Sequence, residues 1–143
     1  MSLSRVVITL IAYLAYSSFA LADSSHTYVI TYPSSSINEI PRNHVRSIFT
    51  MRLRKWPNGS PVTLVTLTDD HQTHINFVQA TVRLFPYQLR RSWDRFIYTG
   101  TGQAPIEVKT EAEMIDYVSK TPGTIGYVSK EPTNENVTVL KLL

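Results

Sequence analysis

Cysteine is absent from this 143-residue chain. Its absence excludes thiol chemistry, disulfide bridges and a lipid-anchored N-terminal cysteine, so the folded part must be held together by packing. After the first 22 residues the chain also lacks any apolar stretch that reaches the ~20 residues needed to span a membrane. The sequence contains no internal repeat and no low-complexity tract.

The common catalytic signatures are missing as well. The chain has no G-x-S-x-G elbow, no H-E-x-x-H motif and no Walker-type phosphate loop. His71 and His74 lie three residues apart at a predicted helix start, a spacing that puts them on one face. With Asp69 or Asp70 they could ligate a metal, but no third ligand follows at a fixed spacing. We therefore expect no catalytic residue, no cofactor and no metal site, and a metal-dependent hydrolase is the third-ranked hypothesis.

The first 22 residues have the three parts of a secretory signal peptide. Arg5 is their only charged residue, an apolar run follows over residues 6–15, and Ala20-Leu21-Ala22 gives the small-x-small pattern of a cleavage site. We expect cleavage after Ala22, which places residues 23–143 in the periplasm or outside the cell. An uncleaved N-terminal anchor is the alternative.

Basic residues are concentrated in the middle of the chain. Nine of the 14 lie between Arg42 and Arg95, where only three acidic residues oppose them. A local positive field favours anionic ligands or surfaces, although solvated helix faces explain the pattern equally well. For an exported chain with a formal net charge of only +3, nucleic acid is not an expected partner.

Hydrophobic patterning predicts one α/β domain over residues 23–143. Runs of β-branched and aromatic residues predict strands at 27–32, 61–67, 124–128 and 137–142. Periodicity and capping residues predict helices over 41–49, from 70 to about 84, from 86 onward, and from 110 to about 120. Strand 61–67 is mostly apolar on both faces, which is typical of a strand in a sheet covered on both sides.

The junction between this strand and the following helix has a physical case for ligand binding. Helix N-termini present unpaired N–H groups, and ligands of open α/β sheets bind beyond the carboxyl ends of strands. We expect a small anion there, held by Thr68, His71, Gln72 and Thr73. The neighbouring carboxylates at positions 69 and 70 would repel an anion and could cap the helix themselves.

Three stretches of the chain resemble one known family. They are Ser47-Ile48-Phe49-Thr50 followed by Lys55-Trp56-Pro57-Asn58-Gly59, the strand 62–67 with residues 69–77, and Pro122-Gly123-Thr124-Ile125-Gly126-Tyr127-Val128. Together they resemble the phosphate-type periplasmic substrate-binding proteins of bacterial ABC transporters, over nearly all of residues 23–143. The resemblance implies a single three-layer lobe of a type II periplasmic-binding-protein-like fold, without enzymatic activity.

The chain departs from the family at the ligand site. In the family, the strand leads to an arginine and then to a Ser-Gly-Thr triplet that grips phosphate. Aligned on Phe77, those positions are Leu67 and then His71, Gln72 and Thr73, so only the threonine is kept. The family also binds its ligand between two lobes, and this chain has room for one. We therefore expect an exported solute-binding-like protein that holds phosphate or another small anion weakly.

The alternative is an accessory module in the periplasm that has lost ligand binding. A single lobe exposes the face that a second lobe would cover, and this face could dock a protein partner or a second copy of the chain. The basic segments 52–55 and 90–91 would then meet an acidic partner.

Overall fold

A computed structural model describes residues 25–33, 36–133 and 136–143. The expected signal peptide and its cleavage site after Ala22 lie outside the described residues. Over the described ranges, none of the helices has the length and apolar character needed to cross a membrane.

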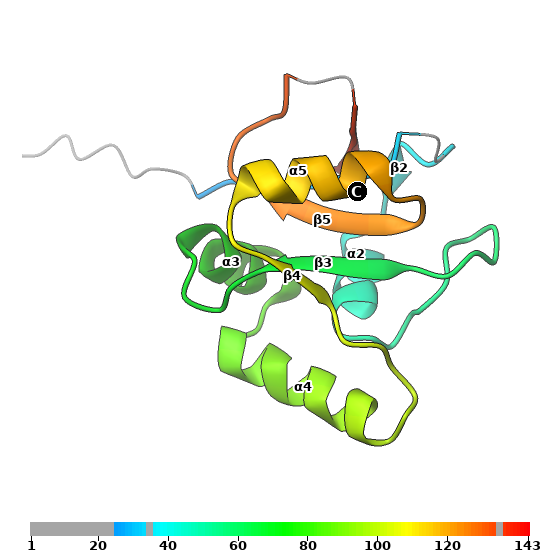
Figure 1. The fold of residues 1–143 in the computed structure, drawn as a ribbon, viewed down its shortest axis with the longest axis vertical. Helices are drawn as coiled ribbons and strands as arrows, with labels where there is room; N and C mark the ends of the chain where they lie inside the picture. The colour runs from blue at the N-terminus through cyan, green and yellow to red at the C-terminus, as the bar shows by residue number, and fades with distance from the viewer. Residues whose placement is uncertain (1–24, 34–35, 134–135) are drawn as a thin grey trace, which may run out of the picture.

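Within the described residues, six strands form one mixed sheet at the centre of the molecule (Figure 1). The strands follow the order β2-β6-β1-β5-β3-β4, and their bounds are β1 Tyr28–Thr31, β2 Glu39–Ile40, β3 Thr63–Leu67, β4 Ile106–Val108, β5 Thr124–Val128 and β6 Thr138–Leu142. β1 is antiparallel to both of its neighbours, β5 and β6, whereas β3 is parallel to β5 and β4. β5 lies inside the sheet, and all five of its residues are buried.

Helices cover both faces of this sheet, as the two apolar faces of strand 61–67 predict. They are α2 (Arg42–Phe49), α3 (Gln72–Phe77), the π-helical turn η1 (Val78–Val82), α4 (Pro86–Tyr98) and α5 (Glu111–Lys120). On β5, Gly126 faces Met114 and Val118 of α5, whereas the next residue, Tyr127, faces the helices of the other side. Because adjacent strand residues point to opposite faces, the fold has three layers, which confirms the expected α/β class.

An aromatic cluster joins Tyr127 to the helices on that second side. The Tyr127 ring stacks on Phe77 with a centroid separation of 4.0 Å and an interplanar angle of 5°. Phe49 at the end of α2 meets both rings edge-on, at 4.7 Å from Phe77 and 5.9 Å from Tyr127. α4 adds Leu89 and Trp93, which are fully buried. The core therefore sits where α2, α3 and α4 meet β5.

Two of the stretches that carry the family resemblance contact each other directly. Trp56 donates its indole N–H to the carbonyl oxygen of Gly123 over 3.1 Å. Gly123 has a φ of +79°, and a Cβ at this position would lie 2.9 Å from the carbonyl oxygen of Pro61. Both the left-handed backbone and the close approach require glycine.

The four predicted strands are present, within one or two residues at their ends, but the sheet gains two strands at its edges. β2 and β4 have two and three residues, respectively. The predicted helix from 70 to 84 is also divided: α3 begins only at Gln72, η1 continues it, and Arg83, with a φ of +62°, ends it. The helix from 110 is confirmed, since the Thr110 side chain accepts a hydrogen bond from the Glu113 N–H over 3.1 Å.

Candidate functional site

The candidate site lies at the carboxyl end of β3, where the chain leaves the sheet and enters α3. β3 and β4 are parallel and paired in register, with Val65 opposite Ile106 and Leu67 opposite Val108. Their carboxyl ends therefore meet at the same edge of the sheet, which is where ligands of open α/β sheets bind. Glu107 of β4 lies beside this edge.

The cap of α3 differs from the predicted one. The sequence suggests capping by the residues before 71, but the N-cap is His71, whose Nδ1 accepts a hydrogen bond from the Thr73 N–H over 3.2 Å. Asp70 is instead hydrogen-bonded by the Thr68 hydroxyl, and this bond is the main reason why the pKa of Asp70 lies below its usual value. His71 therefore satisfies one of the N–H groups that the sequence assigned to an anion.

The four residues predicted to hold an anion come together in one turn, but three of their side chains already have hydrogen-bond partners and the fourth is buried. Thr68 bonds Asp70, and His71 caps the helix. Gln72 is exposed, and its Nε2 donates to Asn76 Oδ1 over 2.8 Å. Thr73 is buried. These residues are thus neighbours because they follow one another in the chain, and their side chains do not form a set of four free polar groups around one point.

An arginine from a different helix reaches this turn. Arg90 of α4 makes a two-pronged contact with Asp69, from Nε to Oδ2 over 3.0 Å and from Nη2 to Oδ1 over 2.7 Å. Nη2 also lies 3.3 Å from Oε2 of Glu107. The hydrogen bonds to Asp69 are the main reason why the pKa of Arg90 is raised, and the bond to Glu107 adds to this effect. Sequence reasoning missed this arginine, because it placed Arg90 in an exposed basic segment.

Leu67, which stands where the resemblance places the phosphate-gripping arginine, is fully buried. Its side chain belongs to the core and contributes no group to the surface at this edge. The guanidinium of Arg90 is instead the cation beside the carboxyl end of β3. It is held by two carboxylates, so an anion would have to compete with Asp69 for its N–H groups.

His74 is buried, although its spacing from His71 predicts two side chains on one helix face. Only 1% of it is accessible, and its Nδ1 lies against the Tyr127 hydroxyl and 3.3 Å from Thr66 Oγ1. Among the residues that the structure describes, no group of three or more His, Cys, Asp or Glu side chains is arranged to hold a metal.

Polar groups from β3 and α3 surround the buried Tyr127 hydroxyl. The Tyr127 oxygen accepts the Leu67 N–H over 3.0 Å, and the Thr66 hydroxyl donates to the Leu67 carbonyl oxygen over 3.0 Å. The Tyr127 oxygen also lies 3.0 Å from Thr66 Oγ1 and against Nδ1 of His74, so this buried hydroxyl joins β3, β5 and α3.

The second ring nitrogen of His74 has no hydrogen bond to any residue that the structure describes. Nε2 is buried and unpartnered, although it lies 3.6 Å from Oδ1 of Asp69. Burial is the main reason why the pKa of His74 falls below its usual value, and the Asp69 carboxylate opposes this shift. The ring is therefore neutral near pH 7, and Asp69 is positioned between it and Arg90.

No family model matches the sequence. A search of curated proteins likewise gives no match.

Solved structures do match, and they share the fold. One is described as a phosphate ABC transporter substrate-binding protein from Clostridium perfringens with bound phosphate; its TM-score is 0.64 at 18% identity, over 81% of this chain and 44% of that one. PstS from Borrelia burgdorferi matches at a TM-score of 0.58 and 15% identity, over 81% and 46% of the two chains. An ABC-type phosphate transport receptor from Vibrio cholerae matches at 0.57 and 10%, also over 81% and 46%.

The chain therefore spans less than half the length of each of these structures. At such identities the match concerns the fold, and it agrees with the resemblance seen in the sequence. The described residues fold as one part of the architecture found in phosphate ABC transporter substrate-binding proteins.

Proposed function

We propose that this chain is an exported solute-binding-like protein that binds a small anion, such as inorganic phosphate, weakly at the junction of β3 and α3. The observation that carries the proposal is the guanidinium of Arg90 beside this junction, 2.7 Å from Asp69. The shared fold supports it, since one matched structure was solved with bound phosphate. The function is one of binding, without a chemical step.

In this proposal Arg90 takes the role of the family's phosphate-gripping arginine, whose position in this chain is occupied by Leu67. Guanidinium groups bind phosphate as they bind carboxylates, through two parallel N–H···O bonds. The Thr68 hydroxyl and the polar groups of His71, Gln72 and Thr73 would complete the contacts at the start of α3. For this to happen, the Asp69 carboxylate must release Arg90.

The same geometry explains why the affinity would be low. Asp69 competes for the guanidinium with a contact that is already two-pronged, and Glu107 adds a second negative charge nearby. The Arg90 and Asp69 side chains are also 37% and 41% exposed, whereas tight small-ligand sites bury most of the ligand surface. We expect a dissociation constant in the millimolar range, about −4 kcal/mol of binding free energy.

The experiment is thermal unfolding of the protein with phosphate, sulfate or chloride at matched ionic strength. A ligand present at about 100 times its dissociation constant adds about 2.7 kcal/mol to the free energy of unfolding. Phosphate should raise Tm more than sulfate or chloride does. The variant Arg90→Gln should lose most of this shift, whereas Arg91→Gln, an exposed neighbour on the same helix, should keep it.

Two outcomes would contradict the proposal. One is a melting temperature that responds equally to all three anions, which would indicate a salt effect. The other is a phosphate-specific shift that survives in Arg90→Gln, which would place the anion elsewhere on the molecule.

A further inference from the structure

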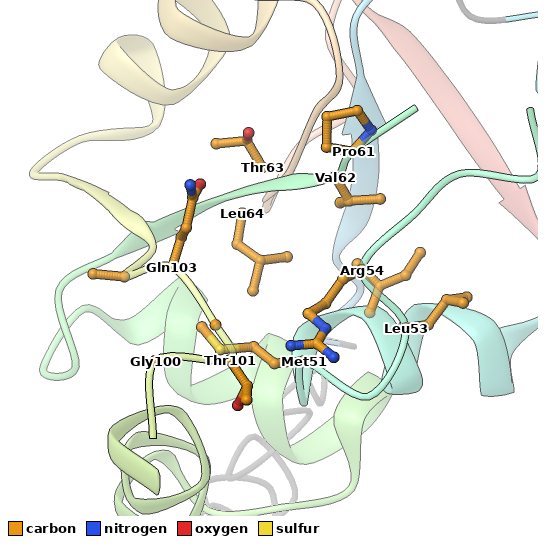
Figure 2. A pocket seen from close by; sticks show the side chains of 13 residues that line it. Met51, Leu53, Arg54, Pro61, Val62, Thr63, Leu64, Gly100, Thr101 and Gln103 are labelled. Carbon is orange, nitrogen blue, oxygen red and sulfur yellow. The ribbon is translucent and has the colours of Figure 1, made fainter. Parts of the chain in front are cut away.

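A cavity of about 250 Å³ opens at the other end of β3, away from the junction with α3 (Figure 2). Its lining includes the start of β3, from Pro61 to Leu64, the chain just after α2, and the loop 100–104 that precedes β4. Since β3 leads away from this cavity to Leu67, none of the residues at the candidate anion site lines it. The cavity is thus a separate feature of the fold.

Two helix ends build the walls of this cavity with fixed backbone geometry. After α2, Met51 has a φ of +62°. Its N–H donates to the Ile48 carbonyl oxygen over 3.0 Å, and the Arg52 N–H donates to the Ser47 carbonyl oxygen over 2.9 Å. These are the two bonds of a Schellman motif, although glycine usually takes the left-handed position. The left-handed residue here is a methionine that lines the cavity.

The end of α4 closes in the same way. Gly100 has a φ of +70°, and the bonds run from Gly100 N–H to Ile97 and from Thr101 N–H to Phe96, both over 3.0 Å. A Cβ on Gly102 would lie 2.9 Å from the Phe96 Cβ and 3.0 Å from the Met51 Sδ. The loop therefore packs closely against Met51, and the terminal helix carbonyls are occupied by backbone N–H groups rather than exposed to the cavity.

The lining combines an apolar floor with one cation. Ile48, Met51 and Leu64 are buried apolar residues, and Leu53 and Val62 extend the apolar surface. Arg54 is exposed and forms no ion pair within the described parts of the chain. Figure 2 shows its guanidinium extending from the segment after α2 toward Met51 and Thr101.

We propose that this cavity binds a small amphipathic carboxylate, with its apolar body on Leu64 and Met51 and its carboxylate on Arg54. An engineered apolar cavity of about 150 Å³ holds benzene, so the larger volume here suits an aromatic ring or short alkyl chain together with a carboxylate. Arg54 provides the paired N–H donors that fit a carboxylate. This inference is independent of the proposed phosphate site.

The test is a titration of the ¹⁵N-labelled protein, followed by its amide NMR signals, with phenylacetate and with the neutral phenylacetamide as probes. We expect saturable shifts at Leu64, Thr101 and Gly102, and tighter binding of phenylacetate. Arg54→Gln should weaken phenylacetate about tenfold, to the affinity of phenylacetamide, because a charge-assisted bond is lost. Arg52→Gln removes a neighbouring exposed charge that does not line the cavity, and it should change nothing.

A second variant tests the cavity without touching Arg54. Ala104 is exposed on the rim, so Ala104→Phe can fill the opening without entering the core, and it should abolish binding of both probes. Shifts confined to residues 68–73, unchanged phenylacetate affinity in Arg54→Gln, or no saturable shift with millimolar probe would each overturn the proposal. Phosphate added to the same sample reports the candidate anion site separately through residues 68–73.

Discussion

Trp93 of α4 donates its indole N–H to the carbonyl oxygen of Phe49 over 2.6 Å. Phe49 is the last residue of α2, and the last carbonyl groups of a helix have no partner within it. The same indole ring lies under the Arg90 guanidinium, at 5.2 Å from the ring centroid to Cζ. One side chain thus joins the end of α2 to the arginine of the candidate site.

Replacing Trp93 with phenylalanine should therefore destabilise the fold. Trp93 is 1% exposed, so the Phe49 carbonyl would be left buried without a partner, at a cost of about 1–3 kcal/mol. Urea unfolding measures this loss. Tyr87→Phe is the control, because Tyr87 is 61% exposed on the same helix, and it should change stability by less than about 0.5 kcal/mol. Equal stability of the two variants would contradict the assigned role of the indole N–H.

The Tyr127 hydroxyl should contribute a similar amount to the free energy of unfolding. Tyr127→Phe keeps the stacking on Phe77 but removes the acceptor of the Leu67 N–H and the hydroxyl that lies against His74 Nδ1. Leaving the buried Leu67 N–H unpaired should cost about 1–3 kcal/mol, measured by urea unfolding. Tyr117→Phe on α5 is the matched control, since Tyr117 is only partly buried. A Tyr127→Phe protein as stable as the wild type would mean that the hydroxyl network adds nothing.

Stability should also depend on pH through His74. Burial lowers the pKa of His74 from its usual value of 6.5 in the folded protein, with Asp69 opposing and Arg90 reinforcing the shift. The unfolded chain therefore binds a proton near pH 6.5 that the folded chain does not. The free energy of unfolding should fall as the pH drops below about 6.5, and this contribution should level off below the lowered folded pKa.

Urea unfolding at pH values from about 5 to about 8, the range in which histidine titrates, measures how the free energy of unfolding depends on pH. His74→Gln should flatten this dependence, even where the variant is less stable at every pH. His44→Gln, at an exposed position of α2, should keep the wild-type slope. An unchanged slope in His74→Gln would assign the dependence to other groups.

The elements that the sequence predicted are those with a local pattern. β5 and β3 are runs rich in β-branched residues and buried on both faces, and α5 begins at the capping-box sequence of residues 110–113, so each was visible from its own residues. β2 and β4 were not, because strands of two or three residues are defined by the neighbours they pair with. Glu39, for example, is in a strand through its register with Lys141.

The candidate site was predictable only in position. The order of strand and helix placed residues 68–73 correctly at the carboxyl end of β3. The pairing of Asp69 with Arg90, 21 residues later, leaves no pattern in the sequence, because it depends on how α4 docks. The burial of His74 did have a signal, since it precedes Phe77 by three residues and so shares a helix face with a core aromatic residue.

Asp69 lies between His74 and Arg90, and removing its charge should improve a property of the protein, whereas the substitutions above impair one. Asp69→Asn should strengthen phosphate binding, because it removes a competing negative charge and frees the Arg90 guanidinium. We expect about a tenfold lower dissociation constant, or ~1.4 kcal/mol, measured by isothermal titration calorimetry. The cost in stability should stay below about 1 kcal/mol, since the Arg90 and Asp69 side chains are 37% and 41% exposed.

Asp70→Asn separates the loss of a negative charge from the release of the Arg90 guanidinium. It removes the same charge one residue away, but Asp70 is bonded by Thr68 rather than by Arg90. If release of the arginine matters, Asp69→Asn tightens phosphate clearly more than Asp70→Asn does. If both variants tighten it equally, only general repulsion has been relieved, and Arg90 is not the anion's partner. If neither does, the carboxylates at this edge of the sheet do not limit phosphate binding, and competition between Asp69 and the anion for Arg90 is disproved.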